Sequence, residues 1–204
     1  MKQYIEAGLA LATLATIVTL SACASTDVQA SGMEGNTGLS LVGGAGPAMF
    51  NSSTGDSSNF SGDVDEEDIA INLGGAYRFD PRWSGELTYT DFGELTFDGL
   101  YMGTPSEGTV TATAIEATAV YHHPIDEGWE AIGMAGLVLW DAEEEELFGG
   151  APDDDDDSGT SLKAGLGVQT SVTDNFLVRL TYEHYFDIWD DTIDVVMLRG
   201  LWTP

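Results

Sequence analysis

The stretch SLKAGLGVQTSVTDNFLVRLTYE, residues 161–183, alternates apolar and polar side chains on both sides of a turn at residues 173–175. Before the turn, Leu162, Ala164, Leu166, Val168 and Val172 alternate with Ser161, Lys163, Gly165, Gly167, Gln169 and Ser171. After the turn, Val178, Leu180 and Tyr182 alternate with Arg179, Thr181 and Glu183. Successive side chains of a β-strand point to opposite faces, so each segment has one apolar and one polar face. The stretch therefore predicts two antiparallel strands joined by a short turn.

Similar segments recur along the chain, and none has a convincing helical period. We predict eight strands, at residues 37–50, 68–79, 83–92, 109–122, 129–141, 160–172, 176–185 and 193–202. The second of them alternates as clearly as the sixth and seventh, whereas the first, fourth, fifth and eighth are less regular. Pro47 cannot donate a hydrogen bond to a closed ladder, so we expect the first strand to end or bulge there.

The connections between these strands differ in length. Three are short and rich in turn formers, at residues 80–82, 123–128 and 173–175. Four are long and polar, at 51–67, 93–108, 142–159 and 186–192. Long loops on one side and short turns on the other are typical of an outer-membrane barrel. The pattern predicts an all-β fold, an eight-stranded antiparallel up-and-down transmembrane β-barrel.

A soluble β-sandwich would also show alternating strands, and other features favour the barrel. The strand count is even, and aromatic side chains lie near the predicted short turns, as expected at a membrane interface. They are Phe79, Trp83, Tyr121, Trp129, Phe176 and Trp202.

The N-terminus indicates export. Lys2 precedes an uncharged run at residues 7–22 that is too short and too rich in Ala and Thr for a confident membrane helix. We assign residues 1–30 to an export signal and 31–204 to the barrel domain. Two processing sites fit: LSAC at 20–23 matches a lipobox, in which Cys23 would be lipidated, and VQA at 28–30 matches ordinary signal cleavage. Cys23 is the single cysteine, so no intrachain disulfide is expected.

Composition limits the partners. Only 6 Lys and Arg residues face 35 Asp and Glu residues, which gives a net charge of −29. A nucleic-acid-binding protein needs a basic surface, so nucleic acid is excluded as a partner. The carboxylates gather between regular apolar segments, which indicates a folded chain and not a disordered one.

Two further stretches carry a family resemblance. Residues 75–93, GAYRFDPRWSGELTYTDFG, resemble the second hairpin of the OmpA-like outer-membrane barrels, with the motif G-x-Y-R-F, a turn, and E-L-x-Y-x-D-F-G. Residues 165–183 are similar to the sixth and seventh strands of the same family, and the likeness extends over essentially the whole mature chain. The chain departs from the family at Trp202, which is followed by Thr203 and Pro204 in place of a terminal aromatic that the assembly machinery reads. No peptidoglycan-binding domain follows the barrel, so the cell-wall tether of larger members is not carried over.

Strand parity places most of the scarce bases inside the barrel. We expect a lumenal charge network of Arg78, Glu86, Glu116, Lys163, Arg179, Glu183 and Arg199, because buried charges must be paired. The family resemblance implies the same kind of plug. Eight strands enclose an interior that side chains can fill, so we expect a solid barrel without a channel.

The acidic runs permit a second interpretation. We favour a solvated acidic surface, but carboxylates are also the ligands that Ca²⁺ prefers, and no other cofactor is expected. The candidates for a weak Ca²⁺ site are Glu143, Glu144, Asp153, Asp154 and Asp155, although the run lacks the glycine and final glutamate of an EF-hand.

Three function classes follow from these features. The first is a structural barrel with acidic extracellular loops. It would contact outer-membrane lipid and lipopolysaccharide and be inserted by the barrel-assembly machinery. The second is a surface binding module, an adhesin or cation-binding barrel whose ligand the sequence does not name. The third is a lipid-modifying enzyme, which needs a nucleophile or a paired acid and base. No His-x-Ser element lies near His122, His123 or His184, so we expect no enzymatic activity.

Overall fold

The computed structural model describes residues 38–51, 60–65, 67–148, 151–188 and 191–204. The side chains of residues 60–65, 148 and 151–154 lie outside this description as well. The described residues all belong to one compact unit, Gly35–Pro204. The predicted export signal and Cys23 lie outside the described residues. Among the residues that are described, no helix has the length and hydropathy needed to cross a membrane.

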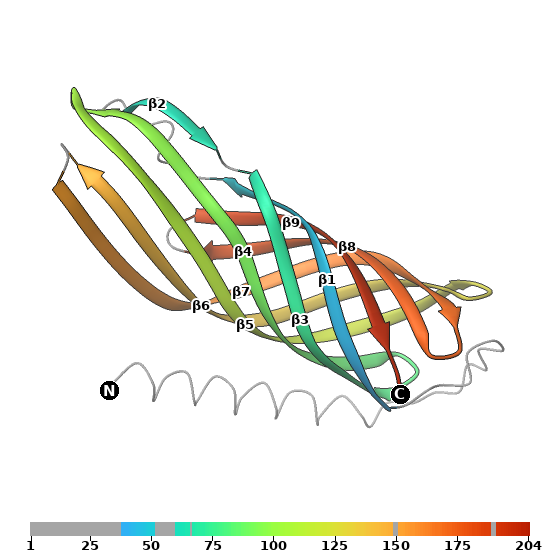
Figure 1. The fold of residues 1–204 in the computed structure, drawn as a ribbon. Helices are drawn as coiled ribbons and strands as arrows, with labels where there is room; N and C mark the ends of the chain where they lie inside the picture. The colour runs from blue at the N-terminus through green and yellow to red at the C-terminus, as the bar shows by residue number, and fades with distance from the viewer. Residues whose placement is uncertain (1–37, 52–59, 66, 149–150, 189–190) are drawn as a thin grey trace, which may run out of the picture. The chain divides into compact units, whose positions relative to one another are not determined.

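Nine β-strands form the described part of the chain (Figure 1). They are β1 (Gly38–Asn51), β2 (Phe60–Asp65), β3 (Glu67–Asp80), β4 (Trp83–Tyr101), β5 (Thr104–Asp126), β6 (Trp129–Phe148), β7 (Ala151–Thr173), β8 (Phe176–Ile188) and β9 (Asp191–Trp202). The sheet order is β2-β4-β3-β1-β9-β8-β7-β6-β5, and β4 also pairs with β5. All strands except β2 therefore form a closed antiparallel ring, and the eight-stranded up-and-down barrel is confirmed.

Alternation along the strands separates the two faces of the ring. Outward positions are apolar and exposed, as at Leu73, Leu166 and Leu198, which are 68%, 65% and 55% exposed. The predicted aromatic side chains gather at the end with the short turns, where Trp83 and Tyr121 meet edge to face with ring centroids 5.1 Å apart. The outer face is widely apolar, whereas the buried inner face carries charged and polar side chains together with an apolar cluster, as expected of a membrane barrel and not of a water-soluble one.

The strands are longer than the sequence pattern predicts. The predicted loops at 93–108 and 142–159 are wrong, because most of their residues extend the ladders of β4 with β5 and of β6 with β7. Met102 and Gly103 close the first of these hairpins with φ values of 52° and 84°. Positive φ at both central residues gives the backbone twist that a two-residue hairpin requires. The acidic runs therefore lie on strands and not in a loop.

These extensions build a structure that rises above one side of the ring, and β2 adds to it by pairing with β4 (Figure 1). We call it the overhang, and it comprises residues 60–65, 94–101, 104–111, 141–148 and 151–160. A bulge marks its base on β4, where the register shifts between Asp91 and Glu94 and Gly93 has a φ of +83°. Because of the extra residue, even-numbered side chains of β4 point inward below the bulge and odd-numbered ones above it. Phe92 and Leu95 are therefore both buried.

Pro47 does not end the first strand. β1 continues to Asn51 and stays in register with β3, with Pro47 opposite Ile69. The neighbouring Gly46 lies so close to β9 that an added Cβ would stand 1.8 Å from the carbonyl oxygen of Val196. β1 pairs with β9 at Ala45 and again at Ala48 in the same register, so this ladder is interrupted at Gly46 and Pro47, where proline supplies no N–H.

Candidate functional site: the lumenal charge network

Two opposite walls of the barrel are joined by an ion pair inside the lumen. Arg179 lies on β8 and Glu86 on β4, four strands apart around the ring in either direction. The Nη1 atom of Arg179 lies 2.5 Å from Oε1 of Glu86, and both side chains are buried. The Nε atom of Arg179 also donates to Oε1 of Gln169 at 2.9 Å. The pair spans the lumen at this level.

Glu183 on β8 connects a second group of charges. Its Oε2 accepts from Nζ of Lys163 at 2.9 Å, and both of its carboxylate oxygens accept from Arg199 on β9. Lys163 also donates to Oε2 of Glu116 on β5, at 2.5 Å. Since β5 and β9 are opposite each other in the ring, this chain of charges crosses the lumen a second time.

Neutral donors complete this group. The hydroxyl of Tyr185 has two carboxylate acceptors within reach of its one hydrogen, Oε1 of Glu116 at 3.0 Å and Oε2 of Glu183 at 3.1 Å. The hydroxyl of Thr88 donates to Glu116 at 3.1 Å. Burying a charge costs several kcal/mol unless a partner and further hydrogen bonds compensate. Here the carboxylates of Glu116 and Glu183, both 0% exposed, have cationic and neutral donors together.

Arg199 needs space that a glycine on the neighbouring strand provides. A Cβ at Gly44 of β1 would lie 2.6 Å from Cγ of Arg199. The arginine reaches past β1 to donate from Nε to Oδ1 of Asn72 at 3.1 Å. Asn72 in turn donates to the hydroxyl of Thr90 at 2.7 Å. The network therefore extends to the walls formed by β3 and β4.

Arg78 pairs with Glu130, a residue outside the predicted set, and Gln169 connects this pair to Arg179. Arg78 lies near the short-turn end, and its Nη2 is 2.8 Å from Oε1 of Glu130 on β6. Oε2 of Glu130 lies 3.2 Å from Nδ1 of His122 and accepts from Nε2 of Gln169 at 2.6 Å. Arg78 also donates to the backbone carbonyl of Pro81 at 2.5 Å. A second group of charges thus closes this end of the lumen, and Gln169 links it to Arg179.

Sequence reasoning missed His122 and Glu130, and strand parity could have found both. Glu116 was assigned to the lumen, and His122 lies six residues further along β5, on the same face. Even-numbered positions of β6 are likewise buried, as Ile132, Met134 and Glu130 show. His122 is 2% exposed and lies on the inner face of β5.

Ser84, His122 and Glu130 stand in the order of a nucleophile, a base and an acid. The hydroxyl of Ser84 lies 2.8 Å from Nε2 of His122, and Nδ1 of His122 faces Glu130. The exposed fractions are 3%, 2% and 2%, so all three side chains are buried inside the barrel. Arg78 and Gln169 both donate hydrogen bonds to the same Glu130 carboxylate. The arrangement is that of a packed polar group.

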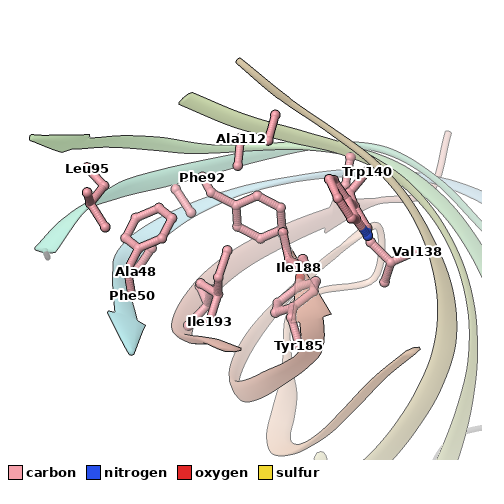
Figure 2. Close-up of a cluster of buried hydrophobic side chains, with 14 of the residues drawn as sticks. Ala48, Phe50, Phe92, Leu95, Ala112, Val138, Trp140, Tyr185, Ile188 and Ile193 are labelled. Carbon is pink, nitrogen blue, oxygen red and sulfur yellow. The ribbon is translucent and has the colours of Figure 1, made fainter. Parts of the chain in front are cut away.

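An apolar cluster fills the lumen above the charges, toward the overhang (Figure 2). Its large members come from several strands and include Phe50, Phe92, Trp140, Tyr185, Ile188 and Ile193. Phe92 and Tyr185 meet edge to face with centroids 4.8 Å apart. Tyr185 therefore packs in the apolar layer with its ring and holds the charged layer with its hydroxyl. Packed side chains therefore lie at three successive levels of the lumen: the group around Glu130, the charges around Glu86 and Glu183, and the apolar cluster.

The predicted Ca²⁺ site is not assembled by the described residues. Among them, no group of three or more His, Cys, Asp or Glu side chains lies close enough to hold a metal ion. Glu143, Glu144 and Asp155 lie on β6 and β7, and Glu144 is opposite Asp155 in the ladder. The side chains of Asp153 and Asp154 lie outside the described set, so the site stays a prediction.

A comparison of the sequence with protein families finds one match. A model described as "Outer membrane protein beta-barrel domain" matches residues 10–197. No curated protein matches the chain.

Solved structures with the same fold include several surface proteins. Neisserial surface protein A is 16% identical, with a TM-score of 0.56, and the match covers 83% of this chain and 99% of that one. Ail, the attachment invasion locus protein of Yersinia pestis, is 17% identical, with a TM-score of 0.52 and coverages of 81% and 97%. OprG from Pseudomonas aeruginosa is 11% identical, with a TM-score of 0.50 and coverages of 83% and 96%. At these identities the likeness shows the fold alone.

Proposed function

The chain belongs to the outer-membrane protein β-barrel family and lies in the cell outer membrane, and we propose that it serves there as a structural barrel that conducts no ions. The single observation that carries the proposal is the Arg179–Glu86 pair, which joins opposite walls inside the lumen. The charge chain through Glu183 and the apolar cluster above it add packed side chains at further levels of the lumen.

Planar-bilayer recording tests this function. The reconstituted wild-type protein should give no stable, large conductance, because an eight-stranded barrel has an interior that side chains can fill. The double variant Arg179→Ala with Glu86→Ala serves as the comparison, since it removes the contact across the lumen. Reproducible porin-like steps from the wild-type barrel would refute the proposal.

The overhang favours a second candidate function, a surface binding module. It presents paired strands above one side of the ring, with carboxylates in high density and no Lys, Arg or His in its sequence. One structure of Ail contains the heparin analogue sucrose octasulfate, a polyanion. The acidic overhang would repel such a ligand, so a ligand for this chain should carry positive charge.

A strain with shortened hairpins would separate the two functions. The residues to remove are 94–111 and 142–159, with short turns put in their place. Retained envelope integrity with lost attachment would support the binding module. Lost integrity with normal barrel assembly would show that the overhang itself supports the envelope, and would count against a separate binding role.

A further inference from the structure

The strand β7 has an edge without a neighbour along the overhang. β8 pairs with β7 from Thr173 as far as Leu162, which lies opposite Phe186. From Ala151 to Ser161, β7 pairs with β6 and with no other strand in the described part of the chain. Figure 1 shows the upper parts of β6 and β7 rising beyond β8 and β9. Within the described residues, one side of β7 is therefore an open sheet edge that covers residues 151–161.

An open edge offers backbone groups to another chain. Every second residue of an edge strand directs its N–H and C=O outward, and an extended peptide can pair with them as an added strand. Natural proteins often place charges on such edges to prevent pairing with themselves. The charge on this edge accordingly selects which chain can be added.

The charge on the β7 edge is uniformly negative. Asp155, Asp156 and Asp157 are exposed, and the ladder sets Asp156 opposite Glu143. Like charges directly opposite each other destabilise a sheet. A cationic strand beside β7 would reduce this repulsion while it satisfies the open backbone groups. A second copy of the same edge would increase the repulsion.

We propose that the β7 edge, residues 151–161, binds an extended polypeptide segment rich in Lys and Arg by β-strand addition. The proposal deepens the second candidate function, the surface binding module, and does not depend on the closed lumen. Backbone pairing would supply the binding geometry, and the aspartates would select basic side chains. A basic tail or loop of an extracellular protein has the required chemistry.

Fluorescence anisotropy with a labelled nine-residue peptide of alternating Lys and Thr tests the proposal on the full barrel in lipid nanodiscs. Binding should be saturable and should weaken as salt is added. A peptide of the same sequence with N-methyl groups on alternate backbone nitrogens keeps its charge but cannot pair as a strand. It should bind at least about tenfold more weakly, a difference of about 1.4 kcal/mol.

Two triple variants separate the edge from the general charge of the overhang. Asp155→Asn, Asp156→Asn and Asp157→Asn remove three charges at the edge. Glu94→Gln, Asp98→Asn and Glu107→Gln remove three charges on β4 and β5 of the same overhang. The first set should weaken binding about tenfold, and the second no more than about threefold. Gel mobility before and after boiling checks that each variant folds.

Amide hydrogen exchange gives an independent readout. Peptide binding should slow exchange within residues 151–161 and leave the β4–β5 hairpin unchanged. Equal affinity for the N-methylated peptide, or equal effects of the two variant sets, would overturn strand addition at β7. Absence of saturable binding would overturn the proposal altogether. Conductance of the same preparation tests the closed lumen separately.

Discussion

Arg179 on β8 and Glu86 on β4 project from opposite walls of the barrel and meet with 2.5 Å between Nη1 and Oε1. The side chains are 1% and 4% exposed, so bulk water cannot replace either partner of this pair. Loss of one partner leaves the other as a buried charge, which is far more costly than loss of an ion pair at the surface.

Replacing Arg179 by Leu should therefore destabilise the barrel by about 3–5 kcal/mol, because Glu86 loses its cationic partner. Replacing Arg82 by Leu in the exposed turn should cost about 0–1 kcal/mol. Urea unfolding in lipid, followed by Trp fluorescence, measures both. A loss at Arg179 no larger than at Arg82 would contradict the role given to the pair. Lower pH should narrow the difference, because protonation removes the orphaned charge on Glu86.

Replacing Gly44 by Val should displace Arg199 from its partners. The added side chain would collide with Cγ of Arg199 and with the carbonyl oxygen of Leu198, and we expect a loss of about 1–3 kcal/mol from overpacking. Gly133→Val is the matched control, because a Cβ at Gly133 meets nothing within 4 Å. The control should change the unfolding free energy by less than about 0.5 kcal/mol. Equal losses in the two variants would indicate an effect of glycine replacement in general.

Glu130→Leu should destabilise the short-turn end of the lumen. Arg78, His122 and Gln169 would lose their shared acceptor, and a buried donor left without a partner costs about 1–3 kcal/mol. Glu127→Leu, in the adjacent exposed turn, provides the comparison. Urea unfolding should rank Glu130→Leu as clearly less stable than Glu127→Leu. The reverse order would show that water satisfies the three donors.

Glu143→Lys should stabilise the upper part of the β6–β7 hairpin. Glu143 lies opposite Asp156 in the ladder, so the change turns a repulsive pair into an attractive one. The expected gain is about 0.2–1 kcal/mol. Slower amide exchange in residues 141–148, compared with Glu143→Gln, would be the measured sign. A lysine variant that exchanges no more slowly than the glutamine variant would show that the two carboxylates do not interact.

The sequence pattern predicted the membrane part of the fold well and the overhang poorly. Strands that contact lipid must alternate, so segments such as 162–172 carry a clear signal. Strands above the membrane have no such constraint. Glu143 and its neighbours on β6 form an unbroken acidic run, which is typical of a loop, yet a long ladder with β7 holds them extended. Met102 and Gly103 lack the Asn-Gly signature of a tight hairpin, so the turn was not visible either.

The charged residues of the lumen follow the same logic. Parity assigned Arg179 and Glu183 to the inner face because they alternate with apolar residues on a regular strand. Their partners depend on which strands face each other across the ring, and alternation along one strand carries no information about that. Glu86 and Arg179 are separated by 93 positions in the chain. Glu130, the partner of Arg78, was missed because the pattern of β6 is less regular than those of β7 and β8.

The bulge at the base of the overhang restricts how the β4–β5 hairpin can change length during evolution. Because Gly93 adds one residue to β4, Leu95 turns inward while Glu94 and Asp98 stay exposed. Loss of that residue, or insertion of another beside it, would turn every side chain above it to the other face. The carboxylates would then crowd the mouth of the barrel and the apolar groups would meet water. Insertions and deletions between this bulge and the hairpin tip should therefore be tolerated in pairs of residues, whereas single ones should be selected against.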